Sequence, residues 1–232
     1  EEYLIGAAQA IAKLNSQNIT PETVRFLEKY TYHAYEYAFV RWHYRLLYAC
    51  WHLKQWDMAK WAVKIMPLLW YASALLLYSK AAFRSSFRNF SFHFDGAHCG
   101  NVCWSEGRVL FLDWEKVSYR DDYTFTLVRF ATSIDEEKGE ISELMMDSLI
   151  DYYLSVCPDT LPHFRELAWA RLLERQFSDL VLFSYIYAKK IKDARKRGLT
   201  AKVLPVSAVA NIATRYRHLK SLLHLVCGRL FA

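Results

Sequence analysis

Six polar residues suited to metal-assisted chemistry lie between positions 93 and 115 of the chain: His93, Asp95, His98, Asn101, Asp113 and Glu115. Asp95, Asn101 and Asp113 supply the carboxylate and amide oxygens that suit Mg²⁺, which binds through one or two carboxylates together with phosphate oxygens. Asp113 directly follows an apolar run, 109–112, where a carboxylate needs a structural or chemical reason to be present. This stretch therefore indicates a Mg²⁺ site that works with a phosphate-bearing ligand.

Short strands are expected to position these residues. Residues 90–94 alternate between polar and apolar types, as in a strand, and the apolar runs 101–104 and 108–112 are joined by the hairpin signal Ser105-Glu106-Gly107. The chain has seven glycines, of which Gly96, Gly100 and Gly107 fall in this region, and only Gly6 precedes them. Tight backbone turns are therefore expected at the polar residues and scarcely anywhere before them.

The rest of the chain has the periodicity of helices. Apolar residues recur at helical spacing over 4–14, and Thr20-Pro21-Glu22 is typical of a helix start. The pattern continues to about Lys80, with breaks expected near 54–57 and at Pro67, and it resumes around Asp122 and runs through 141–156, 164–192 and 206–225. With no repeat and no linker that would separate a second domain, we expect a mainly α fold with a small β-hairpin insert.

Five tryptophans crowd the helical region before residue 80: Trp42, Trp51, Trp56, Trp61 and Trp70. Aromatic side chains dominate the burial of apolar area in cores, so packing between helices is the expected role. Stacking against a ligand is the alternative.

The polar stretch resembles the catalytic core of the aminoglycoside phosphotransferase and choline kinase group, small-molecule kinases of the protein-kinase-like fold. That group shows H-G-D-L-H-P-G-N, a short hairpin and then D-W-E or a close variant. This chain reads H-F-D-G-A-H-C-G-N over 93–101, and Asp113-Trp114-Glu115 follows twelve residues after Asn101. The resemblance implies that residues 1–232 form the helical C-terminal lobe of such a kinase, with the catalytic and metal-binding hairpin at 90–115.

The resemblance also implies a role for each residue. Asp95 would orient the acceptor hydroxyl and take its proton, and Asn101 and Asp113 would hold Mg²⁺ on the phosphates of ATP. His93, His98 and Asp122 would support the loop. The expected function is then an ATP- and Mg²⁺-dependent phosphotransferase acting on the hydroxyl of a small molecule whose identity the sequence does not give.

Three departures from the family pattern keep an alternative open. Asn101 follows Asp95 by six residues where the family has five, Phe94 replaces a glycine, and Thr126 replaces an aspartate that braces the loop. Before residue 96 the chain has neither a glycine-rich phosphate loop nor a strand pattern that would carry an ATP-anchoring lysine, so an N-terminal lobe would have to come from upstream sequence. The alternative is a catalytically inactive pseudokinase or interaction module of the same fold.

Net charge is +6, and the sharpest basic cluster is 189–202, with seven cations and one anion. Such a cluster can bind nucleic acid or a membrane surface, but a solvated helix end before Gly198 explains it as well, since cations stabilise helix C-termini. No aromatic residue alternates with the basic residues as a nucleic-acid platform requires, so a nucleic-acid partner is the weakest of the alternatives.

The pattern of cysteines and the lack of a recognisable signal peptide predict a cytoplasmic location. The five cysteines are an odd number without framework spacing, which favours a reducing compartment, and Cys99-x₃-Cys103 lacks the second pair of a structural zinc site. No stretch reads as a signal peptide. The longest apolar run, 67–78, is short of the ~20 residues that span a bilayer, so we expect no membrane span.

Overall fold

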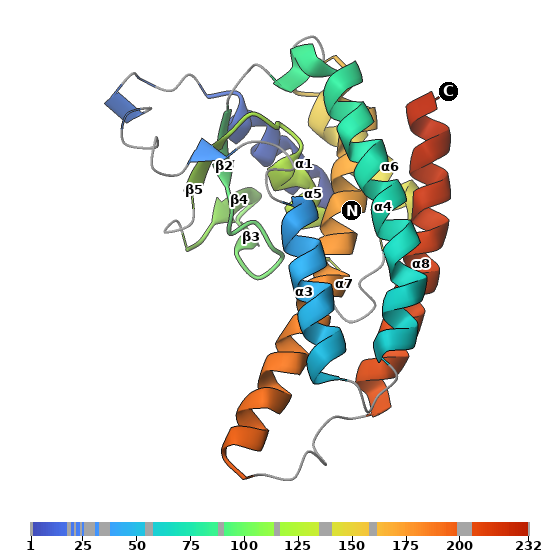
Figure 1. Ribbon diagram of the computed structural model, residues 1–232. Coiled ribbons are helices and arrows are strands. Elements are labelled where there is room, and N and C mark those ends of the chain that lie inside the picture. Colours follow the sequence, from blue (N-terminus) through green and yellow to red (C-terminus); the bar gives the residue numbers. More distant parts are fainter. Residues whose placement is uncertain are drawn as a thin grey trace. The chain divides into compact units, whose positions relative to one another are not determined.

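The computed structural model describes residues 2–17, 20, 22–23, 25, 31–32, 38–53, 58–87, 91–113, 117–134, 141–157, 162–198 and 206–231. It is mostly helical, with two small sheets, which confirms the mainly α fold class (Figure 1). The chain divides into two compact units. Unit 1 comprises residues 1–34 and 78–172, and unit 2 comprises residues 35–77 and 173–232.

Unit 1 holds both sheets. The strands are β1 (Thr31–Tyr32), β2 (Ser91–Phe94), β3 (Val102–Ser105), β4 (Arg108–Phe111) and β5 (Val117–Arg120). In the first sheet β5 is central, parallel to β1 and antiparallel to β2, and β3 and β4 form the second as an antiparallel hairpin. The predicted strand at 90–94 and the predicted hairpin are confirmed, with Phe90 outside the described residues.

Helices α1 (Glu2–Asn15), α5 (Phe125–Ala131) and α6 (Glu143–Leu154) complete unit 1 with the first turns of α7 (Phe164–Lys196), and a short 3-10 helix covers Arg84–Phe87. The buried face of α1 carries mostly small residues, and α1 packs against α6, β2 and β4. Its last residue, Asn15, donates to the Tyr123 carbonyl at 3.1 Å and to the Tyr153 hydroxyl at 3.2 Å. These bonds tie α1 to the segment that precedes α5 and to α6.

Unit 2 is a set of long helices: α3 (Ala38–His52), most of α4 (Met58–Ala82), the second part of α7 and α8 (Val206–Phe231). Trp42 on α3 is fully buried and donates to Ser178 Oγ on α7 at 2.8 Å. Trp61 on α4 makes an edge contact with Tyr216 on α8. The predicted helices over 4–14, 141–156, 164–192 and 206–225 are thus confirmed, several of them longer than predicted.

Two helical predictions are wrong. α4 runs through Pro67 without ending there. Proline removes the hydrogen bond to the carbonyl four residues earlier, that of Val63, and both residues lie on the exposed side of α4, where water can satisfy that carbonyl. Residues 31–32 form β1 instead of helix, because they pair with the distant β5, which local periodicity does not reveal.

The expected burial of the tryptophans holds for Trp42 and is wrong for two others. Trp51 and Trp70 are more than half exposed, while Trp56 lies outside the described residues. α4 is also the one described helix whose length and composition would allow it to cross a membrane, a weak indication by itself. In its most apolar window only 39% is buried, so much of its apolar surface faces outward.

Candidate functional site

The β3–β4 hairpin brings Asn101 and Asp113 together. Glu106 and Gly107 form its two-residue turn and both have positive φ, as a type I′ turn requires. The register pairs Val102 with Phe111, and the Leu112 amide donates to the Asn101 carbonyl at 2.8 Å, which extends the pairing by one residue. As a result Asn101 Nδ2 lies 3.5 Å from Asp113 Oδ2 although twelve residues separate them in sequence.

Asp113 has a left-handed backbone, with φ of 62°. This conformation is uncommon for a non-glycine residue and costs about 1–3 kcal/mol, although aspartate tolerates it better than most residues. Strain of this kind accumulates where a side chain must point in a particular direction. Here the strained residue is the one that presents its carboxylate to Asn101.

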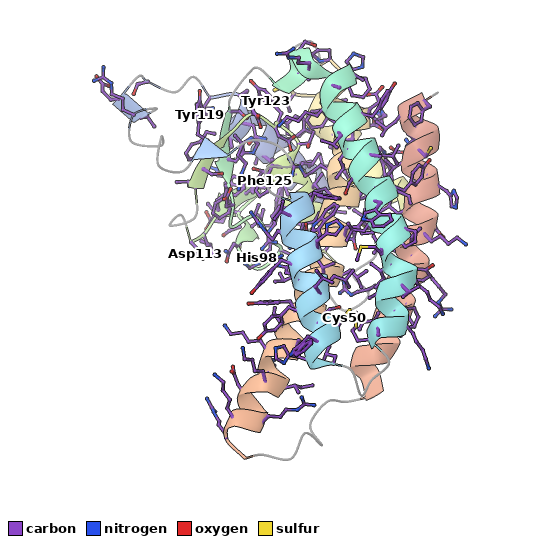
Figure 2. The ribbon with its side chains drawn as sticks, in the orientation of Figure 1. Cys50, His98, Asp113, Tyr119, Tyr123 and Phe125 are labelled. Atoms are coloured by element: carbon purple, nitrogen blue, oxygen red, sulfur yellow. The ribbon has the colours of Figure 1, made fainter. Side chains whose placement is uncertain are left out.

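His98 shapes the loop that leads into the hairpin. Its carbonyl accepts the amides of Asn101 at 2.8 Å and Val102 at 3.1 Å, and its Nδ1 accepts the Gly100 amide at 3.2 Å. Figure 2 shows the side chains of His98 and Asp113 in the region of β3 and β4. These bonds hold the backbone of the loop between His98 and Val102.

The extra residue between Asp95 and Asn101 is accommodated in a turn that the Ala97 amide closes by donating to the Phe94 carbonyl at 3.2 Å. The Gly96 carbonyl then accepts Asn101 Nδ2 at 3.1 Å. A Cβ atom at position 96 would lie 2.9 Å from the buried Phe94 ring, so this turn requires glycine. Two of the three departures from the pattern of the resembling group, Phe94 and the additional residue, therefore lie against each other.

Asp95 lies directly after β2, and its carboxylate is held from β5. Ser91 on β2 is paired with Arg120, and His93 with Ser118, so Ser91, His93 and Asp95 are expected on the same face of the sheet as the two β5 residues. Arg120 donates from Nη2 to Asp95 Oδ2 at 2.9 Å and from Nε to Oδ1 at 3.3 Å, and the Ser118 hydroxyl donates to Oδ1. Both carboxylate oxygens of Asp95 thus have partners.

Arg120 is itself fixed in place. Its guanidinium carbon lies 3.7 Å from the centre of the Phe125 ring, and its Nε also donates to Ser118 Oγ at 2.8 Å. Its side chain is 15% exposed and that of Asp95 25%, so the ion pair is largely shielded from water. Ser118 and Arg120 were not among the predicted site residues, although their alternate positions just before Asp122 are typical of a strand.

His93 is fully buried and makes a hydrogen bond with each ring nitrogen. Nε2 bonds with Ser91 Oγ and Nδ1 with Thr126 Oγ1, both at 2.7 Å. Burial lowers the pKa of His93 to about 3, so the imidazole is neutral at physiological pH. Thr126, which stands where the resembling family has a bracing aspartate, thus connects α5 to the strand that leads into Asp95.

Asp122 lies two residues before the N-cap of α5, Thr124, and its Oδ1 accepts from the Thr124 amide at 3.0 Å and the Thr124 hydroxyl at 2.6 Å. Its Oδ2 pairs with Arg171 on α7. Burial acts to raise the pKa of Asp122, but the Arg171 guanidinium and the Thr124 hydrogen bonds outweigh it and hold the pKa below its ordinary value. These contacts join α5 to α7, so any support that Asp122 gives the 93–101 loop is indirect.

The donors present fit Mg²⁺ held together with phosphate. Asn101 and Asp113 offer an amide oxygen and a carboxylate, and among the described residues no group of three or more His, Cys, Asp or Glu could hold a metal ion alone. Mg²⁺ commonly has only one or two protein carboxylates and fills its other positions with phosphate oxygens and water. Trp114 and Glu115 lie outside the described residues.

No protein-family model matches the chain, and no curated protein sequence matches it. The assignment of a function therefore depends on the residues and their geometry.

Proposed function

We propose that this chain carries the metal-binding and acceptor half of an ATP- and Mg²⁺-dependent phosphotransferase that acts on the hydroxyl of a small molecule, similar to the aminoglycoside phosphotransferase and choline kinase group. The observation that carries the proposal is the approach of Asn101 to Asp113, at 3.5 Å, across the two ends of a tight hairpin. The same amide also bonds to the residue next to Asp95. The nucleotide-anchoring lobe would come from sequence upstream of Glu1.

In this proposal Asn101 and Asp113 hold Mg²⁺. The Asn101 nitrogen donates to Gly96 and Asp113, so the amide oxygen, on the other branch of the same group, is the atom suited to the metal. When bound, Mg²⁺ neutralises charge on the transferred phosphoryl group. In this role the left-handed backbone of Asp113 would direct its carboxylate toward the metal.

Asp95 would orient the acceptor hydroxyl and accept its proton. Ser118 and Arg120 fix the direction of its carboxylate, and such positioning accounts for much of the catalysis in phosphoryl transfer. His93 stays neutral at physiological pH, because burial lowers its pKa to about 3. Its role is to fix β2, through Ser91 and Thr126, next to Asp95.

Two observations favour a second candidate, a catalytically inactive module of the same fold. Arg120 and Ser118 engage both oxygens of Asp95, and the loop from Asp95 to Asn101 is one residue longer than the family pattern. A module of this kind could bind nucleotide and Mg²⁺ without transferring phosphate.

Nucleotide binding and turnover by the natural full-length protein distinguish the two candidates. We expect ATP binding, measured by calorimetry, to require Mg²⁺ and to be lost in Asp113→Asn and Asn101→Ala. Asp95→Asn should retain Mg²⁺·ATP binding but lose ATP turnover, followed as phosphate release or as transfer to a panel of alcohols. Glu106→Gln removes an exposed carboxylate from the hairpin turn and is the matched control.

The possible outcomes separate clearly. Mg²⁺-dependent binding without turnover in the unmodified protein supports the inactive module. If Mg²⁺ changes neither ATP affinity nor thermal stability, or if Asp113→Asn binds and turns over normally, both candidates are wrong.

A further inference from the structure

A stripe of exposed apolar residues runs along α3 of unit 2. Val40, Tyr44, Leu47 and Trp51 follow one another at spacings of four, three and four residues, and each is between 58 and 68% exposed. Trp42, Leu46, Ala49 and Leu53 repeat the same spacing two residues later and are buried. Since two residues correspond to about 200° around a helix, the exposed stripe lies opposite the packed face, on the crest of α3. We call these four exposed residues the α3 crest.

The neighbouring helix α4 continues this surface. Trp70 Nε1 donates to His43 Nε2 on α3 at 2.9 Å, so the two helices lie side by side (Figure 1). The outward residues of α4 are largely apolar within unit 2: Val63, Pro67, Trp70, Tyr71, Ala74 and Leu77. Ile65, Leu69 and Ala72 are buried on its other side. The α3 crest and these α4 residues together form the α3–α4 face.

Cations border the α3–α4 face. Arg41 on α3 and Lys60 and Lys64 on α4 are exposed. On the α7 side, Lys192 Nζ lies 5.4 Å from the Tyr48 ring centre, so the basic end of α7 reaches α3. That end carries six exposed or half-exposed cations: Lys189, Lys190, Lys192, Arg195, Lys196 and Arg197.

The two units have opposite net charge. Unit 2 contains 17 Lys and Arg against 5 Asp and Glu, a formal charge of +12, whereas unit 1 contains 13 against 19, a formal charge of −6. The net charge of +6 for the whole chain is therefore the sum of a strongly basic unit 2 and an acidic unit 1. An anionic partner is complementary to unit 2 and would be repelled by unit 1.

We propose that the α3–α4 face of unit 2 binds the interface of an anionic lipid bilayer. Tryptophan and tyrosine favour the boundary between headgroups and acyl chains, and aliphatic side chains gain free energy by entering it. Lysine and arginine at the border add attraction to anionic headgroups. The α3–α4 face combines all three features.

The position of the apolar residues favours a bilayer over a macromolecular partner. A partner helix lies in a groove between helices, but the α3 crest stands opposite the packed face. Nucleic acid would meet the cations and stack on the aromatic rings but would bury little of Val40, Leu47, Val63 or Leu77. α4 presents one apolar face while the other packs inside its unit, so the proposal is a helix lying on the bilayer.

Cosedimentation of the full-length protein with vesicles tests the proposal. We expect binding to phosphatidylcholine vesicles containing phosphatidylglycerol, much weaker binding to pure phosphatidylcholine, and release by high salt. Leu47→Asp and Trp51→Ser should each reduce the partition coefficient about tenfold, because each removes an apolar side chain from the interface. Circular dichroism should show unchanged helix content, since both residues are exposed.

The matched control is Leu144→Asp. Leu144 is a leucine that is 80% exposed on α6 of the acidic unit 1, and its substitution introduces the same charge without affecting partitioning. Lys60→Gln combined with Lys64→Gln should weaken binding to anionic vesicles and leave binding to neutral vesicles unchanged.

Four outcomes would overturn the proposal. The first is an absence of binding to anionic vesicles, and the second is an equal effect of Leu47→Asp and Leu144→Asp on binding. The third is retention on the membrane after both high-salt and alkaline washing, which indicates a membrane span. The fourth is a wild-type dimer that binds no vesicles and that Leu47→Asp dissociates, which indicates that a second copy of the chain covers this face. The proposal does not depend on the phosphotransferase assignment, because every measurement is made without nucleotide.

Discussion

Arg120 donates hydrogen bonds from two nitrogens to the carboxylate of Asp95, and its guanidinium carbon lies 3.7 Å from the centre of the Phe125 ring. The strand β5 thereby holds the residue that would face an acceptor hydroxyl. Since Phe125 begins α5, the ion pair also joins the sheet to the helix that Thr126 connects to His93. A disturbance at Arg120 should therefore affect both the direction of Asp95 and the packing of unit 1.

Replacing Arg120 by methionine keeps most of the contact with Phe125 but removes the charge. We expect a loss of about 1–3 kcal/mol in the free energy of unfolding, because a shielded carboxylate loses hydrogen bonds from a charged donor. If Asp95 acts as proposed, turnover falls about tenfold or more at unchanged Mg²⁺·ATP affinity. Urea unfolding and steady-state kinetics measure the two effects.

Arg120→Lys is the companion variant for this prediction. It retains the positive charge but cannot donate in the forked geometry of arginine. We expect an intermediate loss of stability and of turnover. Equal turnover in wild-type, Arg120→Met and Arg120→Lys proteins would show that Arg120 does not position Asp95.

The buried imidazole of His93 should make stability depend on pH. Burial lowers its pKa to about 3 in the folded chain, against about 6.5 when unfolded. Above 6.5 both states hold neutral histidine, whereas between about 6.5 and 3 only the unfolded state takes up the proton. Stability is therefore lost as the pH falls through this window, at up to about 1.4 kcal/mol per pH unit.

His93→Gln isolates this contribution. Urea unfolding of the wild type and the variant between neutral and mildly acidic pH should show a smaller acid-induced loss in the variant, whatever its stability at neutral pH. Thr126→Val should cost about 1–3 kcal/mol at neutral pH by leaving Nδ1 without its partner, whereas Thr126→Ser retains the hydroxyl. If the free energy of unfolding depends on pH in the same way in the wild type and in His93→Gln, the low pKa of His93 is not the cause of the acid-induced loss.

The proximity of Asn101 and Asp113 follows from a hairpin signal within a short stretch of sequence. The contacts of Asp95 could not be predicted in this way, because they depend on pairing between strands that are distant in sequence. The hairpin has a two-residue turn with a glycine, so its register follows from sequence and brings its two ends together. The contact of Asp95 with Arg120 depends on the pairing of β2 with β5, strands separated by the whole hairpin. No periodicity within either strand specifies that partner.

The helices of unit 2 show a different limit. On α3, the sets that begin at Val40 and at Trp42 have the same apolar spacing, so the sequence permits either face to be the core. Packing against α7 through Trp42 and Ser178 decides it and leaves Trp51 outside. The sequence therefore shows that α3 has two apolar faces, but it does not show which of them is buried.

The pair of Asp122 with Arg171 should be among the most sensitive contacts of unit 1. Arg171→Met would leave a buried carboxylate without its cation, which costs about 3–5 kcal/mol. Asp122→Asn combined with Arg171→Met should recover part of this loss, because no charge then remains buried. A double-mutant cycle by urea unfolding measures the coupling, and additive effects would show that the two side chains do not act as a pair.

Gly96→Ala tests the turn that accommodates the extra residue of the loop. The added Cβ would lie 2.9 Å from the Phe94 ring, and because Phe94 is fully buried the ring has little room to move. We expect a loss of about 1–3 kcal/mol, together with weaker Mg²⁺·ATP binding, since the Gly96 carbonyl holds the Asn101 amide. Phe94→Leu in the same chain should restore part of the binding by relieving the clash.

Gly228→Ala on α8 is the matched control. Nothing lies within 4 Å of its added Cβ, and alanine favours a helix, so this substitution should raise the free energy of unfolding by about 0.5–1 kcal/mol. If the two alanine variants have the same effect, the steric account of the turn is wrong.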